Sequence, residues 1–369
     1  MSSMILSRRD LAFQLYEWLK VESLVQLPRF SEHSKETFDA VIDLAERLAT
    51  QYFLPHNKKN DQEEPHFDGE KVHIIPEVKI ALTAFKDAGL TAASHDYELG
   101  GMQLPCVVEK AAFSYFFGAN VATSAYPFVA MGNASTIIKH GNQAQIDTFA
   151  RAELEGRFLG TMCLSEPQAG SSLSDITTRA EYERESEFGP QYRLKGNKMW
   201  ISGGEHDLSE NIVHLVLAKV PDENGKLIPG VKGISLFLVP KFLVNTAGEL
   251  GEHNDVSLAG LNHKMGYRGT VNTLMNFGEG TRYKPEGKPG AIGYLVGRLN
   301  EGLHCMFHLM NEARIGVGLG AVLLGYTGYL HSLGYARNRP QGRPLTSGGK
   351  NADSPQVKIV EHADVKRML

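Results

Sequence analysis

Apolar positions recur with helical spacing through the first 160 residues. Behind Ser34, the side chains of Phe38, Val41, Ala45 and Leu48 share one side of a 3.6-residue repeat, which predicts an amphipathic helix capped by the serine hydroxyl. Further helices are expected over residues 80–88, 107–117, 131–140 and 143–154, the first of them ending at Gly89. A polar stretch over 55–65 and a glycine pair at 100–101 predict a loop and a turn between these helices.

After Gly160 the pattern changes to short runs rich in branched and aromatic residues. These runs occupy residues 192–195, 198–202, 212–220, 234–240 and 271–277. The pairs Gly196-Asn197 and Asn224-Gly225 lie between runs or beside them and are typical of hairpin turns. The sequence therefore predicts an antiparallel β domain over residues 161–282.

A long apolar stripe begins near Leu299 and predicts a long helix. The segment ARNRPQGRP, residues 336–344, is expected to end that helix, and another is expected from Gln356. Because its pattern is still periodic at Leu369, we expect the chain to be truncated there, with the helical region continuing in the parent protein.

The order of these elements indicates an α+β fold with three parts. An N-terminal helical domain (1–160) is followed by the antiparallel β domain and by the first, incomplete part of a C-terminal helical bundle (283–369). Strands and helices do not alternate along the chain, which argues against a doubly wound nucleotide-binding fold.

Composition restricts the class of protein further. The net charge of −4 and the lack of a basic run argue against a nucleic-acid partner. The three cysteines form no CxxC pair, which argues against a disulfide framework and favours a reducing compartment. The N-terminus has no apolar signal-like segment, and no apolar run approaches the roughly 20 residues that span a bilayer. We therefore expect a cytoplasmic protein without a membrane span.

Residues 162–172, MCLSEPQAGSS, concentrate small and hydroxyl side chains at the start of the β domain. Ala169, Gly170, Ser171 and Ser172 allow a ligand to approach backbone N–H groups closely. Such a nest of donors suits a phosphate or an electron-rich ring. The same composition also fits a surface turn.

Residues 197–204, NKMWISGG, contain one of the two tryptophans on a predicted strand. Alternation along a strand would put Trp200 and Ser202 on the same face. A flat aromatic ring beside a hydroxyl could hold a flavin ring by stacking and one hydrogen bond. The alternative is a core tryptophan beside an incidental serine.

Together, SEPQAGSS followed by KMWISGG resembles the paired signatures of the acyl-CoA dehydrogenase family. Other segments match the family in the same order: DYELGGMQLP, GNASTIIKHGNQAQ, LEGRFLG, HKMGYRGT, MNEAR and YARNRPQGR. The resemblance covers most of residues 35–369. The segments NEARIGVGLG, YAR and QGR most resemble the sequences of the large bacterial branch that includes methylmercaptopropionyl-CoA dehydrogenases.

The resemblance implies FAD as the cofactor, contacted by Met162, Leu164, Ser165, Trp200 and Ser202. Ser165 would offer its amide and hydroxyl to the pyrimidine side of the flavin, and Trp200 would cover one face of the ring. The Ser202 hydroxyl would approach the reactive flavin nitrogen.

The resemblance also implies contacts with substrate and with a second subunit. Ser171 would contact the CoA portion of an acyl-CoA substrate. Arg339 and Gln341 would reach the FAD of a neighbouring subunit, which implies a homodimer or homotetramer. Three positions depart from the family pattern: Ser172 replaces the usual Asp, Asn338 replaces the usual Glu, and the aromatic residue usual near Gln341 is absent.

Arg314 lies on or beside the apolar stripe of the long helix. Because a buried arginine requires partners, we expect either a substrate contact or an internal ion pair. His304, His308 and Glu312 share one side of the same helix. A single straight helix rarely supplies three metal ligands, so we expect polar packing there and no metal.

The reaction implied by the resemblance is the α,β-dehydrogenation of an acyl-CoA thioester. A carboxylate removes the α proton, a hydride passes to FAD, and the electrons leave to an electron-transfer flavoprotein. Most of the family carries this carboxylate in the last helical segment, and a minority carries it on the long helix, immediately before the arginine that corresponds to Arg314. Here Ala313 occupies that second position, and Glu312 lies about 100° around the helix from it. The catalytic glutamate is therefore expected beyond Leu369, and the chain as given is expected to be inactive. An acyl-CoA oxidase and a non-catalytic, flavin-bearing binding or protective protein are the alternatives.

Overall fold

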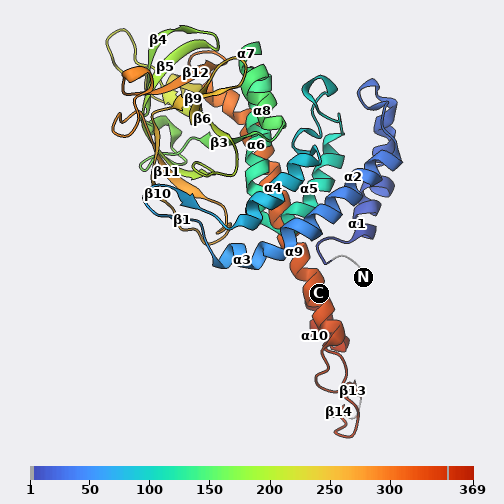
Figure 1. Cartoon of the computed structure of the whole chain (residues 1–369). Helices are drawn as coiled ribbons and strands as arrows, with labels where there is room; N and C mark the ends of the chain where they lie inside the picture. The colour runs from blue at the N-terminus through green and yellow to red at the C-terminus, as the bar shows by residue number, and fades with distance from the viewer. Residues whose placement is uncertain (1–3, 347–348) are drawn as a thin grey trace.

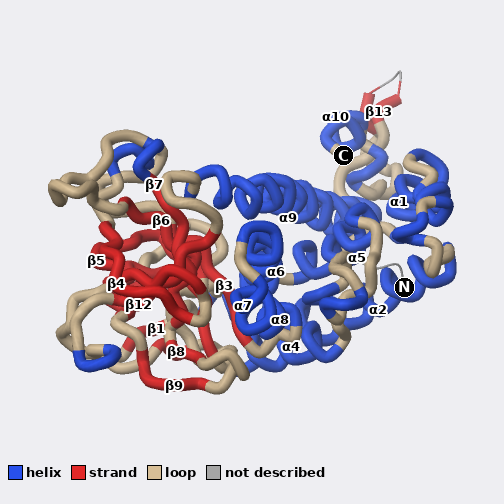
Figure 2. The backbone as a smooth tube through the Cα atoms, turned by 90° about the horizontal axis from the view of Figure 1, so that it is seen from above, coloured by secondary structure: helices blue, strands red, loops and turns tan. Residues whose placement is uncertain are grey.

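Helices and strands gather at opposite ends of the molecule, and one long helix runs along both (Figures 1 and 2). The computed structural model describes residues 4–346 and 349–369. This arrangement confirms the predicted α+β class, with a helical N-terminal region, a central sheet and a helical C-terminal region.

The N-terminal region contains the helices expected from the apolar repeats. Ser34 accepts from the backbone of Thr37 and caps the second helix, while Gly89, with φ 70°, follows the fourth. The helices are α1 (Arg8–Ala12), α2 (Lys35–Leu48), α3 (Asn57–Gln62), α4 (Pro76–Asp87), α5 (Cys106–Ala119), α6 (Val121–His140), α7 (Gln143–Gln145) and α8 (Arg151–Leu154). The prediction of a loop over 55–65 was wrong, because α3 forms there despite its polar composition.

An eight-stranded sheet forms the other end of the molecule. Its main path runs β10-β11-β5-β12-β7-β6-β3, and β4 pairs with β5 and β6 at the side. The strands are β3 (Phe158–Cys163), β4 (Arg179–Ser186), β5 (Gly189–Ser202), β6 (Asn211–Lys219), β7 (Ile234–Pro240), β10 (Val256–Leu261), β11 (Asn272–Phe277) and β12 (Ala291–Val296). Three small hairpins accompany it: β1 (His66–Phe67) with β2 (Val72–His73), β8 (Phe242–Val244) with β9 (Leu250–His253), and β13 (Leu345–Thr346) with β14 (Gly349–Lys350).

The sheet differs from the prediction in three respects. Strand β3 pairs with β6 in parallel, so the sheet is not purely antiparallel. Strand β12 lies between β5 and β7, so the sheet continues past residue 282. Gly196 forms no turn but lies inside β5, where a Cβ would come within 2.3 Å of Thr178 Oγ1. Glycine at this position therefore serves close packing, not chain reversal.

Side chains of α6 join the two ends of the molecule. Asn133 Nδ2 donates to the carbonyls of Thr161 on β3 and Val213 on β6, at 2.9 Å in each case. An aromatic cluster formed largely by side chains of α5, with edge-to-face pairs such as Phe53 with Phe116 and Phe113 with Phe117, contributes to the core of the helical end. The helical end and the sheet are thus held in a defined relation by buried contacts.

Helix α9 (Gly302–Asn338) confirms the long helix and packs against α5, α6 and β7. Several of its apolar side chains are exposed, among them Ile315, Val317, Val322 and Tyr335. Contrary to the expectation from the sequence, α9 is the one described helix long and apolar enough to cross a membrane, by length and composition only. That criterion does not separate a membrane span from a helix of a soluble bundle. The last helix, α10 (Ala363–Met368), starts later than expected.

Candidate functional site

A pocket of about 570 Å³ lies where the loop after β3, the end of β5 and the first turns of α9 meet. It brings together six of the nine residues predicted from the sequence to contact the cofactor or the substrate. Its lining consists of Met162, Leu164, Ser165, Gly170, Ser171, Ser172, Leu173, Ser174, Trp200, Ile201, Val231, Leu303, Phe307, Met310 and Arg314. Ser202, Arg339 and Gln341 are not among these residues.

A β-bulge presents Trp200 to this pocket. Ile201 pairs with Thr273 and Met199 with Leu274, so Trp200 is the extra residue opposite β11. Its backbone is left-handed, with φ 65°, and 55% of the residue is exposed. The expectation that strand alternation puts Trp200 and Ser202 on one face was wrong in its reasoning, because a bulge interrupts the alternation and re-aims the side chain.

Ser202 lies outside the pocket lining, at the last position of β5. Its hydroxyl accepts a hydrogen bond of 3.3 Å from Asn272 Nδ2 on the neighbouring strand. Its predicted approach to a flavin nitrogen remains a prediction.

A buried carboxylate holds both ends of the loop that carries Ser171. Glu166 Oε1 accepts from the Thr178 amide at 3.0 Å and hydroxyl at 2.6 Å. Its Oε2 accepts from the Thr177 amide at 2.8 Å and hydroxyl at 2.9 Å, and from Gln168 Nε2 at 2.7 Å. The motif SEPQAGSS therefore folds as a loop closed at its base by one side chain, a role that the sequence did not reveal.

Lys198 completes this arrangement from β5. Its side chain is 0% exposed, and its Nζ donates to Glu166 Oε1 at 2.9 Å and to the Leu164 carbonyl at 3.0 Å. Burial alone would raise the pKa of Glu166, but the Lys198 charge and the threonine donors lower it to about 2. Glu166 is therefore ionised and paired in the folded protein.

Helix α9 supplies one wall of the pocket through residues spaced by whole turns. Leu303, Phe307, Met310 and Arg314 follow one side of the helix. Arg314 is exposed, so of the two alternatives expected for it, the buried arginine held by an internal ion pair does not apply. Its Nη1 donates to Asn311 Oδ1 at 3.1 Å, and its guanidinium carbon lies 5.1 Å from the centre of the Phe307 ring. The guanidinium group remains accessible to an anion or a carbonyl in the pocket.

The opposite side of α9 faces a second pocket. Glu312 lines it together with Glu109, Lys110 and His308. Because it lines this second pocket, Glu312 is turned away from Trp200 and Arg314, as its position on the helix predicted. Burial raises the pKa of its carboxyl group. Within residues 4–346 and 349–369, no group of three or more His, Cys, Asp or Glu side chains is placed to hold a metal ion.

Arg339 and Gln341 lie at the far end of α9. Arg339 follows Arg314 by 25 residues, or about 38 Å of helix. Backbone hydrogen bonds tie the segment down, from the Gln341 amide to the Val357 carbonyl and from the Ile359 amide to the Arg339 carbonyl, each at 2.9 Å. Both residues are thus distant from the pocket of their own chain.

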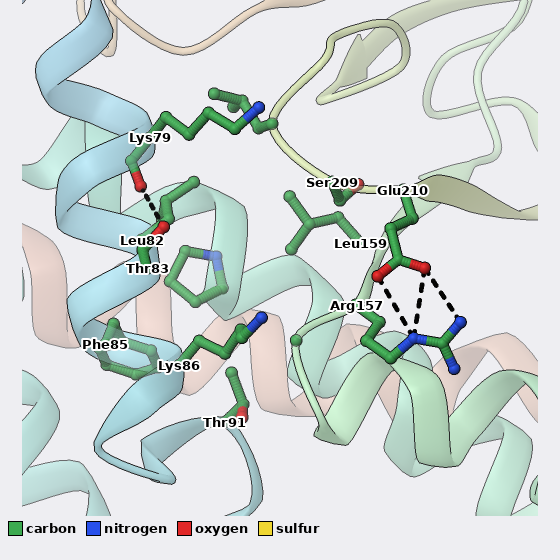
Figure 3. Close-up of a pocket in the computed structure, with 13 residues that line it drawn as sticks. Lys79, Leu82, Thr83, Phe85, Lys86, Thr91, Arg157, Leu159, Ser209 and Glu210 are labelled. Atoms are coloured by element: carbon green, nitrogen blue, oxygen red, sulfur yellow. Dashed lines mark hydrogen bonds and ion pairs between the residues drawn. The ribbon is translucent and has the colours of Figure 1, made fainter.

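A third pocket, of about 390 Å³, lies between α4 and the segments around Arg157 and Glu210 (Figure 3). Lys79 and Lys86 extend toward it from α4, and Arg157 is paired with Glu210 at 2.9 Å. None of the residues predicted for the site lines this pocket.

Comparison with known proteins identifies the family. Residues 161–278 match the acyl-CoA dehydrogenase middle domain. The chain is 36% identical to 3-methylmercaptopropionyl-CoA dehydrogenase of Ruegeria pomeroyi, covering 98% of this chain and 58% of that protein. It is 35% identical to the broad-specificity linear acyl-CoA dehydrogenase FadE5 of Mycobacterium tuberculosis, covering 98% and 57%. The chain thus spans less than two thirds of the length of these relatives.

Solved structures share the fold. An acyl-CoA dehydrogenase from Bacillus anthracis complexed with FAD superimposes with a TM-score of 0.67 at 20% identity, covering 91% of this chain and 48% of that one. The matched middle domain contains the loop of Glu166 and the bulge of Trp200, and the relatives align over almost the whole chain. The chain belongs to the acyl-CoA dehydrogenase family.

Proposed function

We propose that this chain is the flavin- and acyl-CoA-binding part of an FAD-dependent enzyme that desaturates an acyl-CoA thioester between its α and β carbons. The observation that carries the proposal is the pocket that joins Trp200, the Ser165 peptide, Ser171 and Arg314. When bound, FAD would accept the hydride. The residues of the chain supply binding, orientation and exclusion of water.

The lining of the pocket fits a flavin ring. Trp200 offers an aromatic face that its own chain leaves more than half exposed. Among the described residues the Ser165 amide donates to no acceptor, although Ser165 and Leu164 line the pocket. An electron-rich ring edge would satisfy this donor, while Met162 and Leu164 would contact the ring as apolar surface. Ser202, one residue beyond the lining residue Ile201, remains the proposed donor to the reactive nitrogen.

The polar residues on the other side of the pocket fit an acyl-CoA. Ser171 lies at the exposed crest of the loop held by Glu166, where its hydroxyl can bind the CoA portion. The Arg314 guanidinium can donate two parallel hydrogen bonds to an oxygen-rich group of the substrate. Arg339 and Gln341 lie too far away for this pocket, so we propose that they contact FAD of a neighbouring subunit in a homo-oligomer.

The proton-abstracting carboxylate must come from outside this lining. Among the described residues that line the pocket, none is Asp or Glu, and the position before Arg314 is Ala313. We propose that the base glutamate belongs to a part of the protein not included in residues 1–369. We further propose an electron-transfer flavoprotein as the electron acceptor.

Titration of the chain with FAD tests the binding half of this proposal. We expect quenching of flavin fluorescence on binding, and a loss of at least about tenfold in affinity for Trp200→Gly. Glycine accepts the left-handed backbone of this position, so the variant removes the ring without straining the bulge. Saturable binding that is unchanged by Trp200→Gly would place the flavin elsewhere.

Anaerobic addition of acyl-CoA to the flavin-loaded parent protein tests the catalytic half. Bleaching of the flavin absorbance by a member of a straight-chain acyl-CoA series is the expected result. Binding of FAD and acyl-CoA without bleaching would favour a non-catalytic protein. If bleaching occurs, reoxidation by oxygen compared with an electron-transfer flavoprotein separates an oxidase from a dehydrogenase.

A further inference from the structure

We propose that Lys198 is a positioning residue that polarises the peptide bond between Leu164 and Ser165 and thereby strengthens the Ser165 N–H as a donor into the pocket. The proposal rests on the proposed function only for the identity of the ligand, an electron-rich heterocycle. Its geometric basis lies within residues of this chain.

Lys198 and the pocket lie at opposite ends of the peptide group between Leu164 and Ser165. The Lys198 ammonium donates to the Leu164 carbonyl at 3.0 Å, on the side away from solvent. The Ser165 N–H belongs to the same peptide group, and Ser165 lines the pocket. A peptide is planar and conjugated, so a cation at its oxygen draws electron density from its nitrogen.

Burial makes this effect large enough to matter. Lys198 is 0% exposed, so its charge acts through a medium that screens poorly. Hydrogen bonds to a charged donor are roughly twice as strong as neutral ones, and successive bonds strengthen one another by about 10–30% each. The Ser165 amide is thus prepared as a strong donor before any ligand arrives.

Neighbouring contacts hold the donor in place. The Ser165 carbonyl accepts from the Met199 amide at 2.9 Å, which ties the serine to the strand that carries Trp200. Glu166 Oε1 accepts from Lys198 at 2.9 Å and fixes the direction of the ammonium. The ion pair of Glu166 and Lys198 therefore helps to position the Ser165 amide, the strand that carries Trp200 and the loop that carries Ser171.

A purely structural role for Lys198 would have different consequences. If the ion pair served only to close the loop, its removal would lower stability and loosen the segment in general. A polarising role requires in addition a change localised to the Leu164–Ser165 peptide. The two roles can be separated with a readout that sees this peptide alone.

The sequence offers such a readout. Leucine precedes serine at four places only: Leu6-Ser7, Leu164-Ser165, Leu173-Ser174 and Leu208-Ser209. A protein labelled with ¹³C-carbonyl leucine and ¹⁵N-serine therefore gives four carbonyl–amide correlations in an NMR spectrum. Ser165→Ala identifies the relevant signal by its disappearance, and the other three serve as internal references.

The variants are Lys198→Met, which removes the ammonium, and Lys198→Met/Glu166→Gln, which removes both charges and avoids an unpaired buried carboxylate. In folded, ligand-free protein we expect the Leu164 carbonyl and the Ser165 amide proton to move upfield, while the other three correlations stay in place. Lys241→Met is the matched control, since it breaks a largely buried pair with Glu205 in the same domain without touching the pocket.

FAD titration completes the test. We expect the double variant to bind FAD about tenfold more weakly than the wild type, and Lys241→Met to bind as the wild type does. An unmoved Leu164–Ser165 signal in the folded double variant, or an equal shift of all four signals, would overturn the proposal, as would unchanged FAD affinity. Failure of the wild type to bind FAD would instead count against the proposed function, while the ligand-free spectra would still decide the role of Lys198.

Discussion

Two buried glutamates in different regions of the molecule show how the surroundings set the state of one side chain. Glu166, at the base of the pocket loop, accepts hydrogen bonds from two threonines, a glutamine and Lys198, and its pKa is lowered to about 2. Glu153, in α8 at the junction of helices and sheet, has no hydrogen-bond partner for either carboxyl oxygen among the described residues. Burial raises its pKa well above the ordinary value.

The difference teaches that burial alone does not decide charge. Both residues are less than 5% exposed. Donors within reach stabilise the carboxylate of Glu166, whereas the surroundings of Glu153 favour the neutral acid. Glu153 Oε1 and the Asn133 side chain both lie against the same face of Gly160, and Asn133 Oδ1 also lacks a partner within residues 4–346 and 349–369. A protonated Glu153 therefore carries a hydroxyl donor in the vicinity of an unpartnered acceptor, Asn133 Oδ1.

The strongest test of this contrast is the removal of the cation beside Glu166. Lys198→Met should lower the free energy of unfolding by about 3–5 kcal/mol, because it leaves a buried carboxylate without its countercharge. Urea unfolding followed by circular dichroism measures the loss. Lys198→Met/Glu166→Gln should recover part of it, and a double variant less stable than the single one would contradict the view that the unpaired charge is the cause.

Acid should act on the same pair. The folded pKa of Glu166, about 2, lies below the ordinary value of 4.5, so its contribution to stability is present above pH 4.5 and is lost as pH falls toward 2. The expected loss is about 3 kcal/mol over this window. Unfolding measured at a series of pH values should show a smaller decline in Lys198→Met/Glu166→Gln; an equal decline would assign the acid sensitivity to other carboxylates.

Glu153→Gln should change the free energy of unfolding in the opposite direction. Because the folded pKa of Glu153 is raised, the wild type loses stability as pH rises above the range where the unfolded glutamate ionises. Glutamine cannot ionise and keeps a donor for Asn133, so the variant should be more stable at pH 8 by about 1–3 kcal/mol. The gain should vanish in acid. A variant whose stability relative to the wild type does not change between acid and pH 8 would contradict a raised pKa for Glu153.

The smallest effect is expected where a carboxylate is exposed. Asp147 accepts from Arg151 Nε at 2.9 Å, with about half of its side chain in solvent. Asp147→Asn should change the free energy of unfolding by no more than about 0.5 kcal/mol, since solvent already stabilises the charge. Thermal unfolding in low and high salt checks this value, and a loss as large as that of Lys198→Met would remove burial as the basis of the comparison.

Local patterns along the chain were sufficient for much of the helical architecture. Ser34, the apolar face behind it and Gly89 define helices by interactions within a few residues, which is why these boundaries were predicted closely. The motifs 162–172 and 197–204 likewise pointed to the residues that now line one pocket. Gly196 was misjudged, because the need for glycine there comes from Thr178, which lies just before the neighbouring strand β4.

What the sequence alone established is the α+β class, the resemblance to acyl-CoA dehydrogenases and most of the pocket residues, because each depends on short segments and their order. The tertiary structure decided which way these residues face. The bulge that turns Trp200 toward the pocket exists only through the pairing of β5 with β11. The charge pair of Glu166 and Lys198 joins residues 32 apart that no local pattern connects. Glu153 and Glu166 are the same amino acid, and only the donors brought near them by folding make one an anion and leave the other a neutral acid.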